Sequence, residues 1–164
     1  MSSIAPMRYW FDTEFDERGP DIQLISIGIV AEDGRTYHAA SADYDDSGAN
    51  DWLRAHVLPP LATLERKPRA RIRQEVLAFL DPAPSEIWAY FGEYDWIVLR
   101  QLIGHMLDWP AGWPLSHMNL EQLRLHLGGP ALPPHGGTVH NALDDALWCR
   151  EAWQHLTRSG IACS

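Results

Sequence analysis

The fold predicted for this chain depends first on residues 9–15, which read YWFDTEF. Aromatic residues with a high β preference dominate this stretch, and turn-forming residues 16–20 follow it, so the pattern predicts a buried strand. Two acids, Asp12 and Glu14, stand where such a strand should be apolar. Side chains two apart on a strand share one face, so both carboxylates should project together. The alternative is that the strand ends at Asp12 and both acids face water.

The segments that follow predict one α/β domain. Residues 22–31 are apolar and β-branched, and an Asp-Gly pair at 33–34 links them to a third strand over 36–40. Three consecutive strands with short links predict an antiparallel meander. Further along, periodicity predicts short strands and helices, the strands at 87–91 and 115–118 and the helices at 51–57, 68–80, 94–107, 119–127 and 142–156. Strands alternating with helices after a meander predict a mixed sheet that also contains parallel strands and is flanked by helices.

Length, charge and cysteine usage limit the classes of function. The 164 residues suit a single domain over 1–164, with flexible tails expected at 1–6 and 158–164. A net charge of −9 argues against a generic nucleic-acid binder, but not against an enzyme whose acidic site is neutralised by metal ions. The chain has no apolar run of membrane-spanning length, so no membrane partner is expected. Cys149 and Cys163 form no disulfide framework or metal motif, which indicates the cytoplasm.

One dense basic run stands out within this acidic chain. It consists of Arg66, Lys67, Arg69, Arg71 and Arg73. Such a run is either the solvated face of a helix or a guide for phosphate groups, and the sequence leaves both alternatives open.

The helix expected after Gly92 carries an acid on its apolar side. Val98, Leu99, Leu102 and Met106 form a stripe at helical spacing. Asp95 lies three residues before Val98 and four before Leu99, so it should project from the same stripe. A favourable interaction with the helix dipole would explain an acid in this first turn, but not its direction.

The last helix offers two adjacent acids for comparison. Its buried stripe is expected to contain Ala142, Ala146, Cys149 and Trp153. Asp145 lies at the edge of this stripe, whereas Asp144 points nearly opposite, towards solvent. Asp145 is therefore the candidate ligand and Asp144 the ordinary surface acid.

His140 precedes this helix, directly before its expected N-cap. Asn141 is a suitable capping residue, and Asp144 at the third helical position would complete a loose capping box. His140 is then outside the helix and can reach the candidate site from a loop that contains Gly136 and Gly137.

Four acids now share one expected location: Asp12, Glu14, Asp95 and Asp145. Clustered carboxylates need cations, and ligation by oxygen atoms alone favours Mg²⁺ or Mn²⁺. Two such ions about 4 Å apart can stabilise the attacking and leaving oxygens of phosphoryl transfer. A histidine with a near-neutral pKa, here His140, can take the proton from the attacking water.

These residues resemble the three exonuclease motifs of the DEDD superfamily. Asp12-x-Glu14 matches the first motif, Asp95 after Tyr94 the second, and His140 five residues before Asp145 the third, with the histidine of the DEDDh branch. Residues 8–15, 24–35 and 52–59 are also similar to the ribonuclease AS group of bacterial 3′-exoribonucleases. The resemblance covers most of the chain and is weakest over residues 108–138. It implies a ribonuclease H-like fold.

The resemblance also implies an activity. It describes a homodimeric 3′–5′ exoribonuclease that removes nucleoside 5′-monophosphates from free RNA 3′ ends, with a preference for adenylate-rich RNA. The four acids would hold two Mg²⁺ ions, for which Mn²⁺ can substitute, and His140 would be the general base. Phe15, Ser26 and Glu93 are candidate substrate contacts, and Phe15 is also suited to core packing. The alternatives are a DNA or small-oligonucleotide exonuclease with the same site, and a non-catalytic nucleic-acid-binding module.

Overall fold

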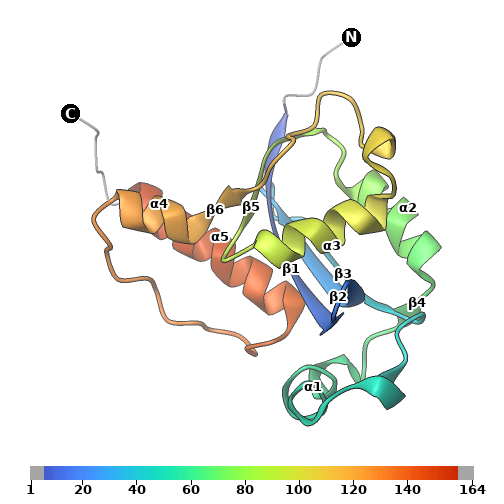
Figure 1. The fold of residues 1–164 in the computed structure, drawn as a ribbon. Coiled ribbons are helices and arrows are strands. Elements are labelled where there is room, and N and C mark those ends of the chain that lie inside the picture. The colour runs from blue at the N-terminus through green and yellow to red at the C-terminus, as the bar shows by residue number, and fades with distance from the viewer. Residues whose placement is uncertain (1–5, 159–164) are drawn as a thin grey trace.

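A mixed sheet of six strands forms the centre of residues 6–158, the part of the chain that the computed structural model describes (Figure 1). The strand order is β4-β3-β2-β1-β5-β6. β1 (Met7–Arg18), β2 (Asp21–Ala31) and β3 (Thr36–Ser41) are antiparallel neighbours, as the meander required. Three further strands extend the sheet on both sides through parallel pairs: β4 (Arg66–Lys67), β5 (Pro84–Ala89) and β6 (Met118–Asn119).

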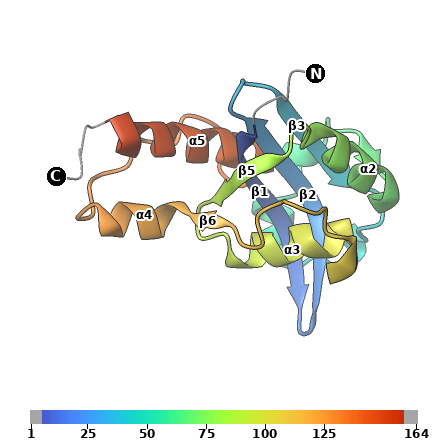
Figure 2. The ribbon, with the colours of Figure 1, turned by 90° about the horizontal axis from the view of Figure 1, so that it is seen from above.

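Helices cover both faces of this sheet (Figure 2). On one face, α2 (Arg69–Phe79) and α3 (Glu93–Ile103) pack against Tyr9 and Phe11 of β1. On the other face, α5 (Ala142–Arg158) packs against Trp10. The alternation along residues 9–11 therefore assigns each face of β1 to a different set of helices.

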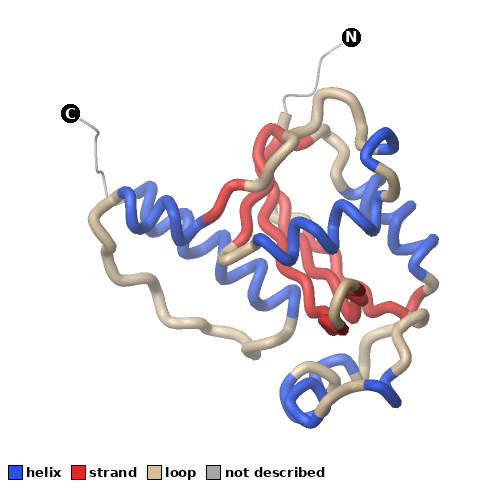
Figure 3. Tube along the Cα trace, in the orientation of Figure 1, coloured by secondary structure: helices blue, strands red, loops and turns tan. Residues whose placement is uncertain are grey.

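The remaining helices lie around this core. α4 (Leu120–His126) lies beside α5, and an extended loop connects the two helices (Figure 3). α1 (Asp51–His56) packs through Leu53 in a cluster with Ile25 of β2 and Ala40 of β3. Short 3₁₀ turns at Asp46–Gly48, Pro59–Leu61 and Met106–Asp108 complete the helical segments of residues 6–158.

Several expected boundaries differ from the structure. The helix expected to reach residue 107 ends at Ile103, because Gly104 adopts a φ of 129° that leaves the helical region. Met106 is consequently 70% exposed, and its place on the buried stripe was wrong. β5 ends at Ala89 rather than 91. Arg158 belongs to α5 rather than to a tail, and the other expected tail residues, apart from Pro6, lie outside the described residues.

The basic run is occupied by contacts within the chain. Arg66 binds both carboxylate oxygens of Asp46 at 2.7 Å. Lys67 and Arg71 bind Glu75 at 2.8 and 2.9 Å, and the Nε of Arg73 donates to the carbonyl of Ile103. The contacts of Lys67 and Arg73 connect α2 to its neighbours, whereas the Arg71–Glu75 pair lies within the helix. Side chains engaged in this way favour a structural role of the run over a phosphate guide.

Two further expectations concern compartment and membrane. Cys149 is a buried free thiol, and Cys163 lies outside the described residues. Within the described range, no helix has the length and apolar character that crossing a membrane requires.

Candidate active site

Asp12 and Glu14 lie in the middle of β1, which continues unbroken to Arg18. The alternative in which the strand ends at Asp12 is therefore wrong. Glu14 is buried and Asp12 is half-buried, and both approach α5, because Asp12 shares a pocket with Asp145 and Glu14 lies beside it. A β-bulge follows immediately, between Glu14 and Phe15.

A close approach between α5 and β2 brings the third motif to these acids. Gly28 pairs directly with Asp12 across the sheet. A Cβ added to Gly28 would lie 2.3 Å from the backbone of Ala142 and Leu143, in the first turn of α5. A side chain here would push the helix away from the sheet, so glycine is what allows His140 and Asp145 to reach β1.

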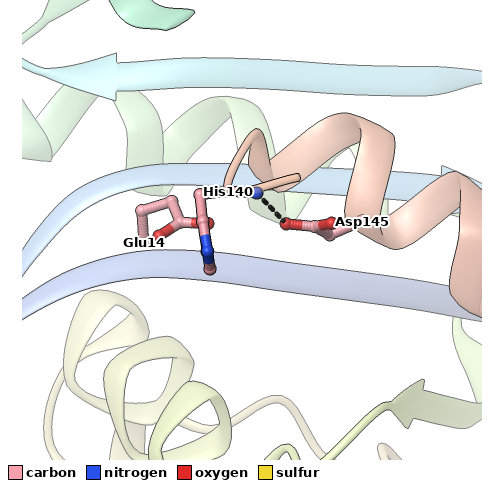
Figure 4. A group of neighbouring side chains, drawn as sticks. All are labelled: Glu14, His140 and Asp145. Atoms are coloured by element: carbon pink, nitrogen blue, oxygen red, sulfur yellow. Dashed lines mark hydrogen bonds between the residues drawn. The ribbon is translucent and has the colours of Figure 1, made fainter. Parts of the chain in front are cut away.

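The structure brings Glu14, His140 and Asp145 into one group (Figure 4). One potential ligand atom from each residue lies within 4.8 Å of the other two. The backbone N–H of His140 donates to Oδ2 of Asp145 at 3.1 Å, while His140 itself adopts a φ of 64°. This turn directs the imidazole towards Glu14 rather than along the helix.

Aromatic side chains of α1 surround the imidazole of His140. The ring of Trp52 meets it edge-on with centroids 4.9 Å apart, and the ring of His56 lies at 6.2 Å. The sequence analysis predicted this helix but missed its contact with His140, which is distant along the chain. Helical periodicity carries no information about such a pairing.

Asp95 confirms the predicted inward direction, since it is only 6% exposed on α3. Its Oδ1 accepts hydrogen bonds from the backbone N–H of Thr13 at 2.9 Å and from the Thr13 hydroxyl at 2.6 Å. The sequence analysis assigned no role to Thr13. This residue fixes Asp95 beside β1, although Asp95 and Asp12 lie outside the tight group around Glu14.

The two acids of α5 differ as predicted in direction, but Asp144 is not a free surface acid. It is half-buried, and its Oδ2 accepts a hydrogen bond from the N–H of Thr138 at 2.8 Å. Asn141 caps the helix by accepting from Leu143 and Asp144 N–H groups, as expected. The capping box does not form, because the N–H of Asn141 donates to the carbonyl of Thr138 instead.

A second histidine, which the sequence analysis missed, contacts Asp145. His135 Nε2 lies 2.7 Å from Oδ1 of Asp145. The His135 ring stacks on Trp148 with centroids 5.7 Å apart, and the indole N–H of Trp148 donates to the carbonyl of Pro133 at 3.0 Å. His135 belongs to a Gly- and Pro-rich loop without periodicity, so no pattern in the sequence could have placed it.

Burial raises the pKa of all four acids, and repulsion by the other acids adds to the rise for Asp12 and Glu14. Burial, followed by the charges of Asp145 and Asp95, raises the pKa of Glu14 to about 8. The pKa of Asp12 lies well above its usual range for the same two kinds of cause. Burial also raises the pKa of Asp95, against the Thr13 hydrogen bonds, and that of Asp145, against the nearby His135.

These shifts show that burial disfavours the ionised forms of the four carboxylates. A cation beside them would reverse the direction of the shifts by favouring the ionised forms. The four acids offer carboxylate oxygens, and such donors fit Mg²⁺ or Mn²⁺ better than metals that prefer sulfur and nitrogen ligands. The residues present therefore fit divalent cations.

A pocket of about 370 Å³ opens next to this cluster. One part of its wall is polar and ionisable, and the other is aromatic. The lining includes Asp12, Asp145, His135 and His140, together with the rings of Phe11, Tyr90 and Trp148. Such a combination can hold an anionic group at one side and a planar ring at the other.

The three expected substrate contacts have different surroundings. Phe15 is half-buried, packs against the core and stacks on Tyr94 at 5.6 Å, so it serves packing and remains near the surface. Ser26 is fully buried, and its Oγ has no hydrogen-bond partner among the described residues. Glu93 is exposed, but its Oε1 accepts a hydrogen bond from Asn119 at 2.7 Å.

Comparison with known proteins shows the family to which this chain belongs. Residues 7–157 match the 3′–5′ exoribonuclease Rv2179c-like domain. The chain belongs to this family. Two Mycobacterium tuberculosis members are 46% identical over 146 residues, which cover 85% of this chain and 87% of each relative: 3′–5′ exoribonuclease Rv2179c of strain H37Rv and 3′–5′ exoribonuclease MT2234.1 of strain CDC 1551. Membership of the Rv2179c-like family makes the chain an enzyme of the 3′–5′ exoribonuclease class.

Solved structures agree with the fold of this Rv2179c-like domain. A zinc-bound complex of Escherichia coli exonuclease I with single-stranded DNA has a TM-score of 0.70 at 14% identity, over 96% of this chain. The match spans only 41% of the exonuclease I chain. One chain of the structure described as the yeast NOT1 MIF4G domain co-crystallised with CAF1 gives a TM-score of 0.51 at 12% identity, over 92% of this chain and 80% of that one. The likeness to exonuclease I confirms the expected ribonuclease H-like fold.

Proposed function

We propose that this chain is a metal-dependent 3′–5′ exoribonuclease that releases nucleoside 5′-monophosphates from RNA with a free 3′ end. The observation that carries the proposal is the convergence of Glu14, His140 and Asp145, from β1 and the start of α5, to within 4.8 Å. Family membership and the names of the two mycobacterial relatives support the same activity.

Asp12, Glu14, Asp95 and Asp145 would hold two Mg²⁺ ions, and Mn²⁺ would serve in their place. The raised pKa values of these four acids support this role, because ionising them together is costly without cations. When bound, the ions would stabilise the negative charge that develops on the attacking and leaving oxygens of the phosphodiester.

His140 would be the general base that takes a proton from the attacking water. Its imidazole is grouped with Glu14 and Asp145, and two independent contacts limit its orientation. The Asp145 carboxylate holds the backbone N–H, and the ring of Trp52 packs against the imidazole. A base positioned before the substrate arrives loses less entropy on reaching the transition state.

Two finer parts of the proposal rest on the resemblance to the ribonuclease AS group. One is a preference for adenylate-rich 3′ ends, and the other is a homodimer as the active form. The first predicts a higher kcat/KM on A-rich than on mixed RNA. The second predicts a mass of two chains in light scattering. Equal kcat/KM on A-rich and mixed RNA would remove the adenylate preference, and a single-chain mass would remove the homodimer. Neither result would affect the proposed chemistry.

The test uses 5′-labelled oligomers of A-rich RNA, mixed RNA and DNA, each with Mg²⁺, Mn²⁺ or EDTA. We expect a ladder of products that shorten by one nucleotide, with RNA and either metal, and no shortening in EDTA. The DNA arm is included because exonuclease I is described in complex with single-stranded DNA. If DNA is shortened faster than RNA, DNA rather than RNA is the substrate. Intact oligomers in every reaction that contains metal would refute the proposed activity.

A further inference from the structure

Phe91 combines two features that a folded chain normally avoids. Its φ is 50°, in the left-handed region that residues with a large side chain rarely adopt. Its side chain is also 59% exposed, so the ring gains little from core packing. A strained backbone that persists without a packing benefit is typical of residues that bind a ligand.

The position of Phe91 connects it to the carboxylate site. The parallel pairing of β1 with β5 ends at Trp10 and Trp88, and Tyr90 follows Trp88 by two residues as Asp12 follows Trp10. Tyr90 lines the same pocket as Asp12, His140 and Asp145.

The ring of Phe91 lies against the ring of Tyr90, with centroids 4.6 Å apart and planes inclined by 60°. The left-handed turn at Phe91 therefore presents an exposed aromatic ring at the aromatic wall of the candidate site.

The chain around Phe91 does not require an aromatic residue for the turn itself. It is the following residue, Gly92, that must lack a side chain, because a Cβ there would lie 2.3 Å from the Cβ of Ala89. A turn with positive φ is easier for Gly or Asn than for Phe. A large ring at this position must therefore be explained by what it contacts, not by the turn.

We propose that Phe91 is a substrate-binding residue whose ring, backed by Tyr90, stacks on a nucleobase near the 3′ end of the bound RNA. The inference rests on the proposed exoribonuclease function. Stacking accepts any base because every base has a π-face, and it suits an enzyme that removes nucleotides one after another. The carboxylates would act on the phosphate, while Phe91 would hold the base.

A second copy of this chain is the other surface that an exposed ring could meet. The position of Phe91 beside the pocket of Asp12 and His140 favours the base, because a subunit interface here would cover the mouth of that pocket. The experiment therefore measures oligomeric state together with RNA binding.

The variants are Phe91→Asn, Phe91→Trp and the control Leu125→Ala. Asn tolerates the left-handed turn and removes the ring, whereas Trp keeps an aromatic surface. Leu125 has the same 59% exposure but lies on α4, away from the pocket. Binding of a fluorescent A-rich RNA oligomer is measured by anisotropy in EDTA, so that the result does not depend on cleavage. Thermal unfolding and light scattering are measured on the same samples.

Phe91→Asn should weaken RNA binding about tenfold, from the loss of one stacked base. Its Tm should stay constant or rise by a few degrees, because the strain is relieved. Phe91→Trp should keep most of the affinity, and Leu125→Ala should leave affinity unchanged.

Four results would overturn the proposal: unchanged RNA affinity of Phe91→Asn, no RNA binding by the wild type, a fall in the Tm of Phe91→Asn larger than that of Leu125→Ala, or a change in the oligomeric state of Phe91→Asn. Absence of cleavage by a wild type that binds RNA would refute the exonuclease function alone.

Discussion

Replacing Glu14 by Gln should stabilise the metal-free protein while abolishing its activity. Glu14 is 8% exposed, and burial together with the charges of Asp145 and Asp95 raises its pKa from 4.5 to about 8. Between these two pH values the native state retains a proton that the unfolded state has lost. The free energy of unfolding therefore falls as pH rises from 4.5 to 8.

The size of the effect follows from the interval over which the proton is held. At pH 7 the pH lies above the unfolded-state pKa of 4.5, and this difference in pH corresponds to roughly 3 kcal/mol of lost free energy of unfolding, at about 1.4 kcal/mol per pH unit. Gln has no proton to lose, so the variant escapes this cost. For a chain of this length roughly 3 kcal/mol raises the Tm by about 6–12 °C.

The assay is thermal unfolding of both proteins in EDTA at pH 5, 7 and 8, repeated with Mg²⁺. We expect the two Tm values to converge at pH 5 and to separate in favour of Glu14→Gln at pH 8. Mg²⁺ should then raise the Tm of the wild type more than that of the variant, because the cation favours the ionised acids.

Glu75→Gln is the matched control, with the opposite sign. Glu75 accepts hydrogen bonds from Lys67, Arg71 and Tyr37, and its pKa is lowered from 4.5 to about 2. Its stabilising contribution is present above pH 4.5 and is lost as pH falls towards 2. The control should therefore destabilise the protein at pH 8 by about 1 kcal/mol. A lower Tm for Glu14→Gln in EDTA at pH 8, or a difference that does not vary with pH, would refute the reasoning.

The remaining predictions concern the approach of α5 to β1. Asp145→Asn should abolish Mg²⁺-dependent shortening of RNA, whereas Asp144→Asn should largely keep it, because an amide oxygen can still accept from Thr138; the reverse order would contradict the assigned directions. His140→Ala should lower kcat by about 10²–10⁴-fold with little change in Mg²⁺ affinity measured by calorimetry, and a normal kcat would exclude it as the base. Gly28→Ala should lower both Tm and activity, since its Cβ would meet the backbone of Ala142 at 2.3 Å, and wild-type values for both would show that α5 can move without cost.

The sequence by itself determined the central strand, the meander and the faces of the acids. These features depend on local periodicity, which two-residue and 3.6-residue repeats encode directly. The choice of Asp145 over Asp144 and the inward direction of Asp95 follow from the same geometry, and the structure places both acids accordingly. The end of α3 at Gly104 was missed, because a helix pattern does not show the backbone conformation at which it stops.

Only the tertiary structure decided which distant segments complete the site. His135, Trp52 and the contact between Thr13 and Asp95 join residues far apart in sequence or placed by an irregular loop. The close approach at Gly28 depends on how α5 packs on the sheet, not on any property of either segment alone. Local patterns fix the direction of a side chain within its own helix or strand. The distance between two side chains is fixed by packing, in which all elements of the fold take part.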